Sequence, residues 1–465
     1  MISYRKLAMR VLGHSPVSAV KTARRSTAKR AAALALTAAL VVGMTLPAFA
    51  DTWYIEDGDI SISAGTSGNH VEQGEKKQDE TTETIITNRE STASSNAVTI
   101  EAGEGKTVDV TLKNVNIDAS SGAAVSVTGK GDTNIELNGN NTLTSGSGHA
   151  GLEHNKETNS EGKETSGTLT ITDNNNDGKL TANGGIDGAG IGGSDEHDGQ
   201  VTITGGEITA TGGNGAAGIG GGAGDTDAVG GDGDVTISGG TITATGGRLG
   251  AGIGGGAYGN GTVTVTDGDI TAKATGRYGA GIGGGYGAKP SGTLIGGNGT
   301  VTISGGTITE ASGGYMAAGI GSGFQGLGTV TIEGDAVIKN AQGGKAGAGI
   351  GSGTRGDSEI IIRGDAVIEN AESSGNGAGI GSGKGDWYSD GDGMVIDLTV
   401  GNVTIEGNAK IENAKSGSGG SGIGGGALGI GNVIIKGNAQ IGNATGGDEG
   451  AGIGGGVLGT GDVTI

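Results

Sequence analysis

One short motif recurs along this chain, and its spacing constrains the fold more than any other feature. An A-G-I-G or S-G-I-G segment occurs nine times, and its isoleucines serve as markers: Ile191, Ile219, Ile253, Ile282, Ile320, Ile350, Ile380, Ile423 and Ile453. A V-T-I-type segment ends 12 residues after at least five of these markers, and extra residues, where present, number 6, 9 or 13. A second short apolar segment follows, which makes one unit about 30 residues long.

The repeat predicts an all-β fold, a right-handed parallel β-helix (β-solenoid) with coils of about 30 residues. Three short strands without a helical segment suit one coil of a solenoid. In V-T-I the outer residues point inward and Thr points outward, because side chains alternate along a strand. Degenerate units precede the regular ones: HAGLEH at 149–154 takes the place of A-G-I-G, and 12 residues separate Ile100 from Leu112 and Val125 from Leu137. We therefore expect about 13 coils.

The glycines, 109 of 465 residues, serve the same repeat. GAGIGGG at 250–256 contains G-x-G-x-x-G, which in a dinucleotide-binding fold opens a helix and precedes an acidic residue about 20 positions on. Here the glycines run into AYGNGTVTVT, which cannot start a helix. We expect them instead to turn corners at positive φ and to let neighbouring coils approach closely.

A column of asparagines supports the stacking of coils. Asn340, Asn370, Asn413 and Asn443 each follow a second-strand isoleucine by two residues. Stacked side-chain amides can hydrogen-bond from coil to coil, so we predict an asparagine ladder, with four independent surface turn residues as the alternative.

Residues 1–50 differ from the rest of the chain. They hold eight Lys and Arg and no acid, then the apolar stretch 31–46 and Ala48-Phe49-Ala50. This pattern predicts a signal peptide cleaved after Ala50, because the stretch is shorter than the roughly 20 residues of a membrane span. The protein is therefore expected to be secreted, extracellular or cell-wall associated, without membrane insertion after cleavage.

The remaining chain divides by its regularity. We expect a first coil with a polar insertion over 51–95, degenerate coils over 96–190 and regular glycine-rich coils over 191–465. The last V-T-I strand ends at Ile465 without a polar cap, so the solenoid is expected to be truncated there. Loss of the leader leaves 29 − 8 = 21 basic residues against 50 acidic ones, a net charge of −29. Such a charge disfavours nucleic acid as a partner.

Two stretches resemble known families. The run ELNGNNTLTSGSGHAGLE, with the later GTLTITDNNNDGKLTANGGIDGAGIGG, resembles secreted bacterial carbohydrate-binding proteins of the pectate-lyase-like right-handed β-helix superfold. The repeated GAGIGGG with GTVTISGGTITATGG is similar to repeats of large surface proteins from gut bacteria. The resemblance covers most of 95–465 but consists of scaffold motifs. It implies a bacterial protein that binds polysaccharide, often with calcium. We therefore expect a non-enzymatic adhesin or spacer whose partner is a polysaccharide or a host or cell-wall glycan.

The few aromatic residues provide the candidate carbohydrate contacts. Tyr258, Tyr286 and Phe324 follow the marker motif in three successive coils, and Trp387 and Tyr388 lie in the longest insertion. Stacked coils would place the first three in an exposed column, where flat rings suit the faces of sugars. The alternative is that the rings cover a loop corner.

The loop DNNNDG offers the candidate metal ligands. Asp173, Asn175 and Asp177 match the first half of an EF-hand-type calcium loop, with Gly178 at the turn. The second half fails, because position 12 is Gly184 where a Glu is expected. The loop is thus either a calcium site or a polar turn. Further acids gather at the insertion corner and are expected to be solvated: Asp195, Glu196, Asp198, Asp225, Asp227, Asp232, Asp234, Asp386, Asp390 and Asp392.

The alternative function is that of a polysaccharide lyase or glycoside hydrolase. Such an enzyme needs paired acids, or a base with Arg or Lys neighbours, in a groove. Asp386 with Asp390 or Asp392 is the one acid set beside aromatic residues, and the four histidines after residue 50 form no recurring cluster. Ice binding by outward threonines is disfavoured, because isoleucine replaces threonine at 361 and 434.

Overall fold

Alternation of aliphatic residues and threonine builds the strands. In β26 (Gly328–Ile332), Val330 and Ile332 are buried and the threonines beside Val330 are half-buried on the outer face. The second segments alternate in the same way, as in β17 (Glu207–Thr211), where Ile208 and Ala210 are buried. β-Branched residues fit a pleated surface with one buried face, so each segment becomes a strand with one aliphatic side.

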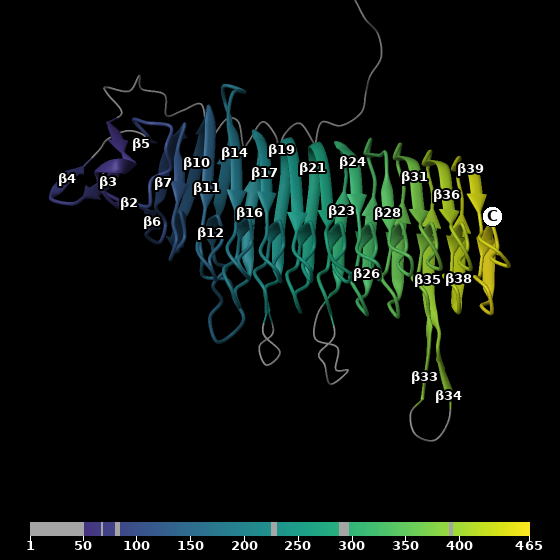
Figure 1. Cartoon of the computed structure of the whole chain (residues 1–465). Helices are drawn as coiled ribbons and strands as arrows, with labels where there is room; N and C mark the ends of the chain where they lie inside the picture. Colours follow the sequence, from purple (N-terminus) through teal and green to yellow (C-terminus); the bar gives the residue numbers. More distant parts are fainter. Residues whose placement is uncertain (1–50, 67, 80–83, 225–229, 288–296, 390–393) are drawn as a thin grey trace, which may run out of the picture. The chain divides into compact units, whose positions relative to one another are not determined.

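The computed structural model describes residues 51–465 except 67, 80–83, 225–229, 288–296 and 390–393. In this part the strands form two long, mainly parallel sheets, and the coils follow one another in chain order (Figure 1). The described part has one helical turn, η1 (Ile55–Asp57), and none of its helices could cross a membrane. The predicted leader, 1–50, lies outside the described residues and stays a prediction.

The larger sheet has 24 described strands, which come from the V-T-I segments and from the segments that follow them. They are β1 (Thr52–Tyr54), β5 (Thr84–Thr87), β7 (Thr107–Lys113), β8 (Asn116–Asp118), β10 (Asp132–Asn138), β11 (Asn140–Thr144), β13 (Leu169–Thr172), β14 (Lys179–Asn183), β16 (Gly199–Ile203), β17, β19 (Gly233–Gly246), β21 (Gly261–Ala274), β23 (Gly299–Ile303), β24 (Thr307–Ser312), β26, β27 (Val337–Ile338), β28 (Ala341–Gly343), β30 (Ser358–Ile362), β31 (Val367–Ser373), β35 (Thr399–Ile405), β36 (Lys410–Ser416), β38 (Gly429–Ile435), β39 (Gln440–Thr445) and β41 (Gly461–Thr464).

The smaller sheet has 15 described strands, and the marker motif supplies most of them. They are β4 (Lys76–Asp79), β3 (Asn69–Gln73), β2 (Ile60–Ala64), β6 (Val98–Ala102), β9 (Val125–Gly129), β12 (Leu152–His154), β15 (Ile191–Gly192), β18 (Ile219–Gly220), β20 (Ile253–Gly254), β22 (Ile282–Gly283), β25 (Ile320–Gly321), β29 (Ile350–Gly351), β32 (Ile380–Gly381), β37 (Ile423–Gly424) and β40 (Ile453–Gly454). Apart from the antiparallel β3 and β4, 15 − 2 = 13 strands run parallel, one for each coil.

The registers confirm the repeat as a right-handed parallel β-helix. Ile253 pairs with Ile219 on one side and with Ile282 on the other, and the other markers stack in the same way. Leu152 of HAGLEH pairs with Ile191, so this motif takes the place of A-G-I-G as predicted. Aliphatic side chains of both sheets fill one continuous core that runs through the described coils.

Three positions predicted in the degenerate coils, Ile100, Leu112 and Leu137, are wrong by two residues. Val98, and not Ile100, pairs with Val125. Ile135, and not Leu137, pairs with Ile171 of the next coil. A shift of two residues along a strand keeps the side chain on the same face, so the pattern of apolar residues could not reveal the slip.

The polar insertion of the first coil forms a hairpin that covers a sheet edge. β3 pairs antiparallel with β2, and β4 pairs antiparallel with β3. The outer strand β4 carries Lys76 and Lys77. An edge strand with lysines resists pairing with another chain, so this hairpin protects the first described strand of the smaller sheet.

Insertions leave the coils at one corner, after the marker strands. Residues 155–166 follow β12, and Thr158 and Glu164 form an isolated bridge within them. The longest insertion follows β32 and forms a hairpin of β33 (Asp386–Ser389) and β34 (Met394–Asp397), which extends away from the coils (Figure 1). The common corner therefore agrees with the predicted place of the extra residues.

Close coil-to-coil contact explains the glycines of the marker motif. Gly254 has φ +127°, and a Cβ atom there would lie 2.0 Å from the carbonyl oxygen of Gly283. At Gly250, a Cβ would lie 2.1 Å from the carbonyl oxygen of Ala216. A side chain has no room at either position, so the scaffold interpretation of GAGIGGG is confirmed.

Side-chain ladders join successive coils. Asn413 Nδ2 donates to Asn370 Oδ1 at 3.2 Å, and Asn443 Nδ2 donates to Asn413 Oδ1 at 2.9 Å. Asn370 Nδ2 donates to the carbonyl oxygen of Lys339 at 3.0 Å, so the predicted ladder is confirmed over its last three members and ends on the backbone beside Asn340.

Candidate functional site

Four aromatic rings form one cluster on the turns beside the marker strands. The predicted residues Tyr258, Tyr286 and Phe324 follow β20, β22 and β25, and Tyr278, which the sequence analysis missed, precedes β22. Ring centroids lie 5.4 Å apart for Tyr258 and Tyr286 and 5.9 Å apart for Tyr286 and Phe324. Tyr278 lies 4.6 Å from Tyr286 and 5.6 Å from Phe324. The three predicted rings are therefore brought together, as parts of a packed cluster.

The prediction of an exposed column is wrong at Tyr258. Its side chain is 7% exposed and packs with Ala223 and Ala257, and Leu249 and Tyr286 lie against this group. Tyr286 and Phe324 are half-buried, and burial raises the pKa of Tyr286. Only Tyr286 and Phe324 stack face to face, and the other ring pairs are tilted or edge-on. Whether these rings bind carbohydrate stays a prediction.

Hydrogen bonds join two sets of turns beside the marker strands. The carbonyl oxygen of Tyr278 accepts the N–H of Phe324 at 3.0 Å, and that of Met316 accepts the N–H of Thr354 at 2.8 Å. In each case the turn before one marker strand contacts the turn after the next marker strand. The two sets meet because a marker strand is only two residues long, so side chains from both form a common ridge.

A groove of about 390 Å³ lies on this ridge and is the candidate binding site. Its polar lining includes Tyr315, Lys345, Ser374, Asn376, Lys384 and Asp386. Tyr315 is 47% exposed, in contrast to Tyr258. Arg277 Cζ lies 5.3 Å from the centroid of the Tyr315 ring, and Lys345 Nζ lies 6.0 Å from it. The groove thus combines an accessible ring with amide, hydroxyl, ammonium and carboxylate groups.

The floor of the groove holds a hydroxyl group without a partner. Thr354 is 2% exposed and lines the groove, and its Oγ1 has no hydrogen-bond partner within the described part of the protein. A buried polar group left unpaired costs about 1–3 kcal/mol. A polar ligand that reached this hydroxyl would recover part of that free energy.

Trp387 lies next to this groove but not in the aromatic cluster. It belongs to β33, directly after the lining residue Asp386, pairs with Ile396 of β34 and is 44% exposed. Asp397 of the hairpin forms an ion pair with Arg355 at 3.0 Å. The side chain of Tyr388, and residues Asp390 and Asp392, lie outside the described residues, so their predicted roles stay open.

The loop predicted to bind calcium forms a turn capped by its own side chains. Asp173 Oδ1 and Asn175 Oδ1 accept the N–H of Asp177 at 3.3 Å and 3.4 Å, and Asp173 Oδ2 accepts the N–H of Gly178 at 3.1 Å. Asp177 Oδ1 accepts the N–H of Gly139 at 3.3 Å. No cluster of three or more His, Asp or Glu side chains suited to a metal occurs among the described residues. Calcium binding here stays a prediction.

Part of the acid set at the insertion corner has a structural role that sequence analysis missed. Asp198 Oδ1 accepts the N–H of Asp232, and Asp232 Oδ1 accepts the N–H of Asn260, each at 2.7 Å. Asn260 Oδ1 in turn accepts the N–H of Asn298 at 3.1 Å. Burial raises the pKa of Asp232, and the negative charge of Asp198 contributes. These oxygens therefore join coils. Asp225 and Asp227 lie outside the described residues.

Three histidines lie on or beside the successive marker-position strands β12 and β15, and their hydrogen bonds do not form a catalytic dyad. Ser194 Oγ lies 3.0 Å from His197 Nδ1, and the same nitrogen lies 2.7 Å from the carbonyl oxygen of Asp195. A carbonyl only accepts, so Nδ1 carries a proton and cannot accept one from Ser194. His149 Nδ1 contacts Glu153 Oε2 at 2.9 Å, and His154 Nδ1 contacts the carbonyl oxygen of Gln200 at 2.9 Å.

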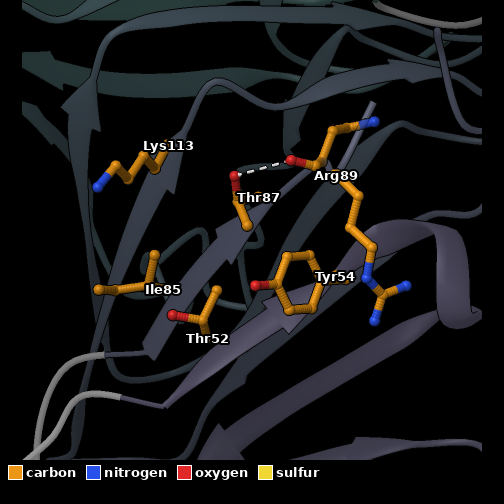
Figure 2. A pocket seen from close by; sticks show the side chains of 7 residues that line it. Thr52, Tyr54, Ile85, Thr87, Arg89 and Lys113 are labelled. Atoms are coloured by element: carbon orange, nitrogen blue, oxygen red, sulfur yellow. Dashed lines mark hydrogen bonds between the residues drawn. The ribbon is translucent and has the colours of Figure 1, made fainter. Parts of the chain in front are cut away.

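A second recess, of about 490 Å³, lies at the first coils (Figure 2). Its side chains come from β1, β5 and β7 and the residues after β5, and they include Tyr54, Thr87 and Lys113. Arg89 lies over the Tyr54 ring at 4.0 Å and binds both carboxylate oxygens of Asp57. Arg89 thus shields the one ring of this recess, which makes it a weaker candidate for stacking against a sugar than the groove at Tyr315.

Comparison with known proteins supports the β-helix fold and gives no information on function. Residues 175–195, 201–223, 235–257 and 301–324 match the Beta helix repeat family. No curated protein and no solved structure matches the chain significantly. The family matches agree with the parallel β-helix, and they say nothing about a ligand.

Proposed function

We propose that this chain is a secreted or cell-surface, non-enzymatic β-helix protein that binds carbohydrate through the groove beside Tyr315. The observation that carries the proposal is this ring, 47% exposed beside a groove of about 390 Å³. Aromatic rings offer a large apolar surface at low conformational cost, and the apolar face of a sugar fits such a surface. Ser374, Asn376 and Lys384 supply hydrogen-bonding groups for sugar hydroxyls.

The regular scaffold suits this function. Each coil adds the same turn one strand spacing further along, about 4.8 Å, so the groove lies on a ridge that runs in the direction of stacking. A polysaccharide also repeats along one direction. We therefore propose a glycan of the host or of a cell wall as the partner, and an adhesin or spacer as the role.

The enzyme alternative, a β-helix lyase or hydrolase, has less support. Asp386 is the one carboxylate among the described residues that line the groove, whereas a glycoside hydrolase uses a pair. Incubation of the protein with polysaccharides distinguishes a binding protein from an enzyme. New reducing ends or unsaturated products that are lost in Asp386→Ala would establish an enzyme and overturn the non-enzymatic proposal.

The binding proposal is tested on a glycan array, in the presence of calcium and of EDTA, with the purified protein and Tyr315→Ala. We expect the variant to lose at least about tenfold in affinity for the bound glycans, since stacking contacts contribute on the order of 1 kcal/mol or more. Ile186→Ala is the control, because Ile186 is exposed and both residues stand five positions before a marker isoleucine. Equal binding by Tyr315→Ala and the wild type would contradict the site.

A further inference from the structure

One surface position carries cations and an aromatic residue in four successive coils. It is the residue five positions before each marker isoleucine, which we call the corner column: Ile186, Asn214, Arg248, Arg277, Tyr315, Lys345, Gly375, Ser418 and Asp448. The markers stack in register, so these residues lie one above another. Only four neighbouring members, from Arg248 to Lys345, are cationic or aromatic.

Backbone hydrogen bonds link the column directly. The carbonyl oxygen of Arg277 accepts the N–H of Met316 at 2.7 Å, and that of Tyr315 accepts the N–H of Ala346 at 3.0 Å. Each bond runs from one member of the column to the residue after the next member. From Arg277 through Tyr315 to Lys345 the spacing is therefore that of the strands, about 4.8 Å for each interval. Arg248 lies one coil before Arg277, and its carbonyl oxygen faces Gly276, the residue before Arg277.

The three cations of the column are available to a ligand. Arg248, Arg277 and Lys345 are exposed, and none forms an ion pair with any residue that the structure describes. Elsewhere, cations do pair across coils, as Lys179 does with Glu207 at 2.7 Å. The chain has 50 acidic and 29 basic residues, so three neighbouring cations without an ion pair to a described residue give this surface a local positive charge.

Contacts with aromatic rings hold two of these cations, Arg277 and Lys345, in place along the corner column. Arg277 lies between the rings of Tyr278 and Tyr315, 5.5 Å and 5.3 Å from their centroids, and Lys345 lies on the Tyr315 ring from the next coil. Cation–π contacts hold charged groups without neutralising them. The ring and the two cations therefore form one prearranged surface, which continues into the groove at Ser374 and Asn376.

From this surface we infer that the ligand is an anionic polysaccharide, bound along the corner column with its acidic groups at Arg248, Arg277 and Lys345. The inference rests on the proposed function and names its ligand class. An extended chain of pyranose rings advances by about one strand spacing for each sugar, so successive carboxylates or sulfates can meet successive coils. Tyr315 then stacks against a sugar ring between two acidic groups.

A nucleic acid fits this surface less well. Duplex DNA carries a charge about every 1.7 Å, far denser than one cation for each coil. The column also includes Asp448, and the chain as a whole is negative, so a long, densely charged polymer would be repelled beyond the four residues. A short, sparsely charged stretch of glycan avoids most of that repulsion.

The test compares alginate with its propylene glycol ester, which has the same backbone with carboxylates masked. Binding to the purified protein is measured with EDTA present and at increasing salt. We expect alginate to bind at least about tenfold more tightly than its ester, and the difference to shrink with salt as screening increases. The triple variant Arg248→Gln/Arg277→Gln/Lys345→Gln should lose at least about tenfold in affinity for alginate.

A matched control separates local from overall charge. Lys106, Lys130 and Lys339 are exposed and form no ion pair with the described residues, so Lys106→Gln/Lys130→Gln/Lys339→Gln removes the same charge elsewhere. This control should bind alginate as the wild type does. Equal losses in both triple variants would mean that overall charge alone acts, and the inference would be overturned.

The remaining outcomes distinguish the two proposals. Binding of alginate and ester with equal affinity, lost in Tyr315→Ala, would leave carbohydrate binding intact and overturn the anionic class. No binding to any glycan on the array or to alginate would overturn the proposed function itself. Binding of a single-stranded oligonucleotide more tightly than alginate, through the same three cations, would replace the glycan with nucleic acid.

Discussion

The side-chain amide of Asn443 donates to Oδ1 of Asn413 at 2.9 Å, and the two residues lie in register on β39 and β36. Nδ2 of Asn413 in turn donates to Oδ1 of Asn370 at 3.2 Å. Every such bond joins two coils that are already paired through their backbones. The ladder therefore reinforces the register that the strands set.

This contact can be measured as a coupling free energy. In a double-mutant cycle, Asn413→Ala and Asn443→Ala should each lower the free energy of unfolding by about 1 kcal/mol, and the double variant should lose less than the sum, by about 0.5 kcal/mol or more. Denaturant unfolding followed by circular dichroism provides the four values. Strict additivity would show that the two side chains act independently.

Alanine in place of Gly254 should be strongly destabilising. Gly254 has φ +127°, and the added Cβ would meet the carbonyl oxygen of Gly283 at 2.0 Å, so backbone strain and overpacking combine to cost about 3 kcal/mol or more. Gly122→Ala is the control, since a Cβ there meets nothing within 4 Å. Thermal unfolding of both variants checks the prediction. A Gly254→Ala protein as stable as the control would mean that coils can separate locally at little cost.

Calcium should raise the melting temperature if the loop at Asp173 binds it. The oxygens of Asp173 and Asn175 already accept backbone N–H groups, so the expected effect is modest and appears at millimolar calcium. The calcium-induced shift should shrink in Asp173→Ala/Asp177→Ala and persist in Asp267→Ala/Asp269→Ala, which removes the same charge from strand β21. Identical melting curves with calcium and with EDTA would show that the folded protein does not bind calcium at this loop.

His154 should make the protein sensitive to mild acid. Burial lowers the pKa of His154 below its usual value of 6.5, although the Gln200 carbonyl and Glu164 oppose the shift. Because the folded state resists protonation, the unfolded state binds more protons as the pH falls below about 6.5, and stability is lost there. His154→Gln should lose less stability than the wild type between pH 7 and pH 5.5, by differential scanning calorimetry.

A second histidine provides the control for this measurement. The pKa of His70 is raised by hydrogen bonds to Glu72 and then to Asp79, so its contribution has the opposite sign: it is present below the usual pKa and disappears as the pH rises. His70→Gln should therefore make the loss of stability on acidification larger than in the wild type. A smaller loss in His70→Gln than in His154→Gln would contradict both assignments.

The sequence alone was sufficient for the fold class, the position of the marker strands and the purpose of the glycines. These features repeat, and a repeated spacing such as that from Ile253 to Ile282 records which residues stack. The asparagine ladder was predictable for the same reason. The two-residue slip at Val98 and Ile135 was not, because alternation along a strand has a period of two and hides it.

The candidate site depended on contacts between turns, which spacing does not record. Tyr258 and Tyr315 are both turn aromatics, yet one is 7% and the other 47% exposed. Tyr258 follows a marker strand and packs against Ala223 and Ala257, whereas Tyr315 precedes a marker strand and lines a groove. The turn before each marker strand hydrogen-bonds to the turn after the next marker strand, and a linear sequence pattern does not contain this offset of one coil. The sequence thus determined the stacking of coils, because backbone pairing follows the repeat. Only the tertiary structure decided which rings and charges face solvent, because that depends on how neighbouring turns fill the space between them.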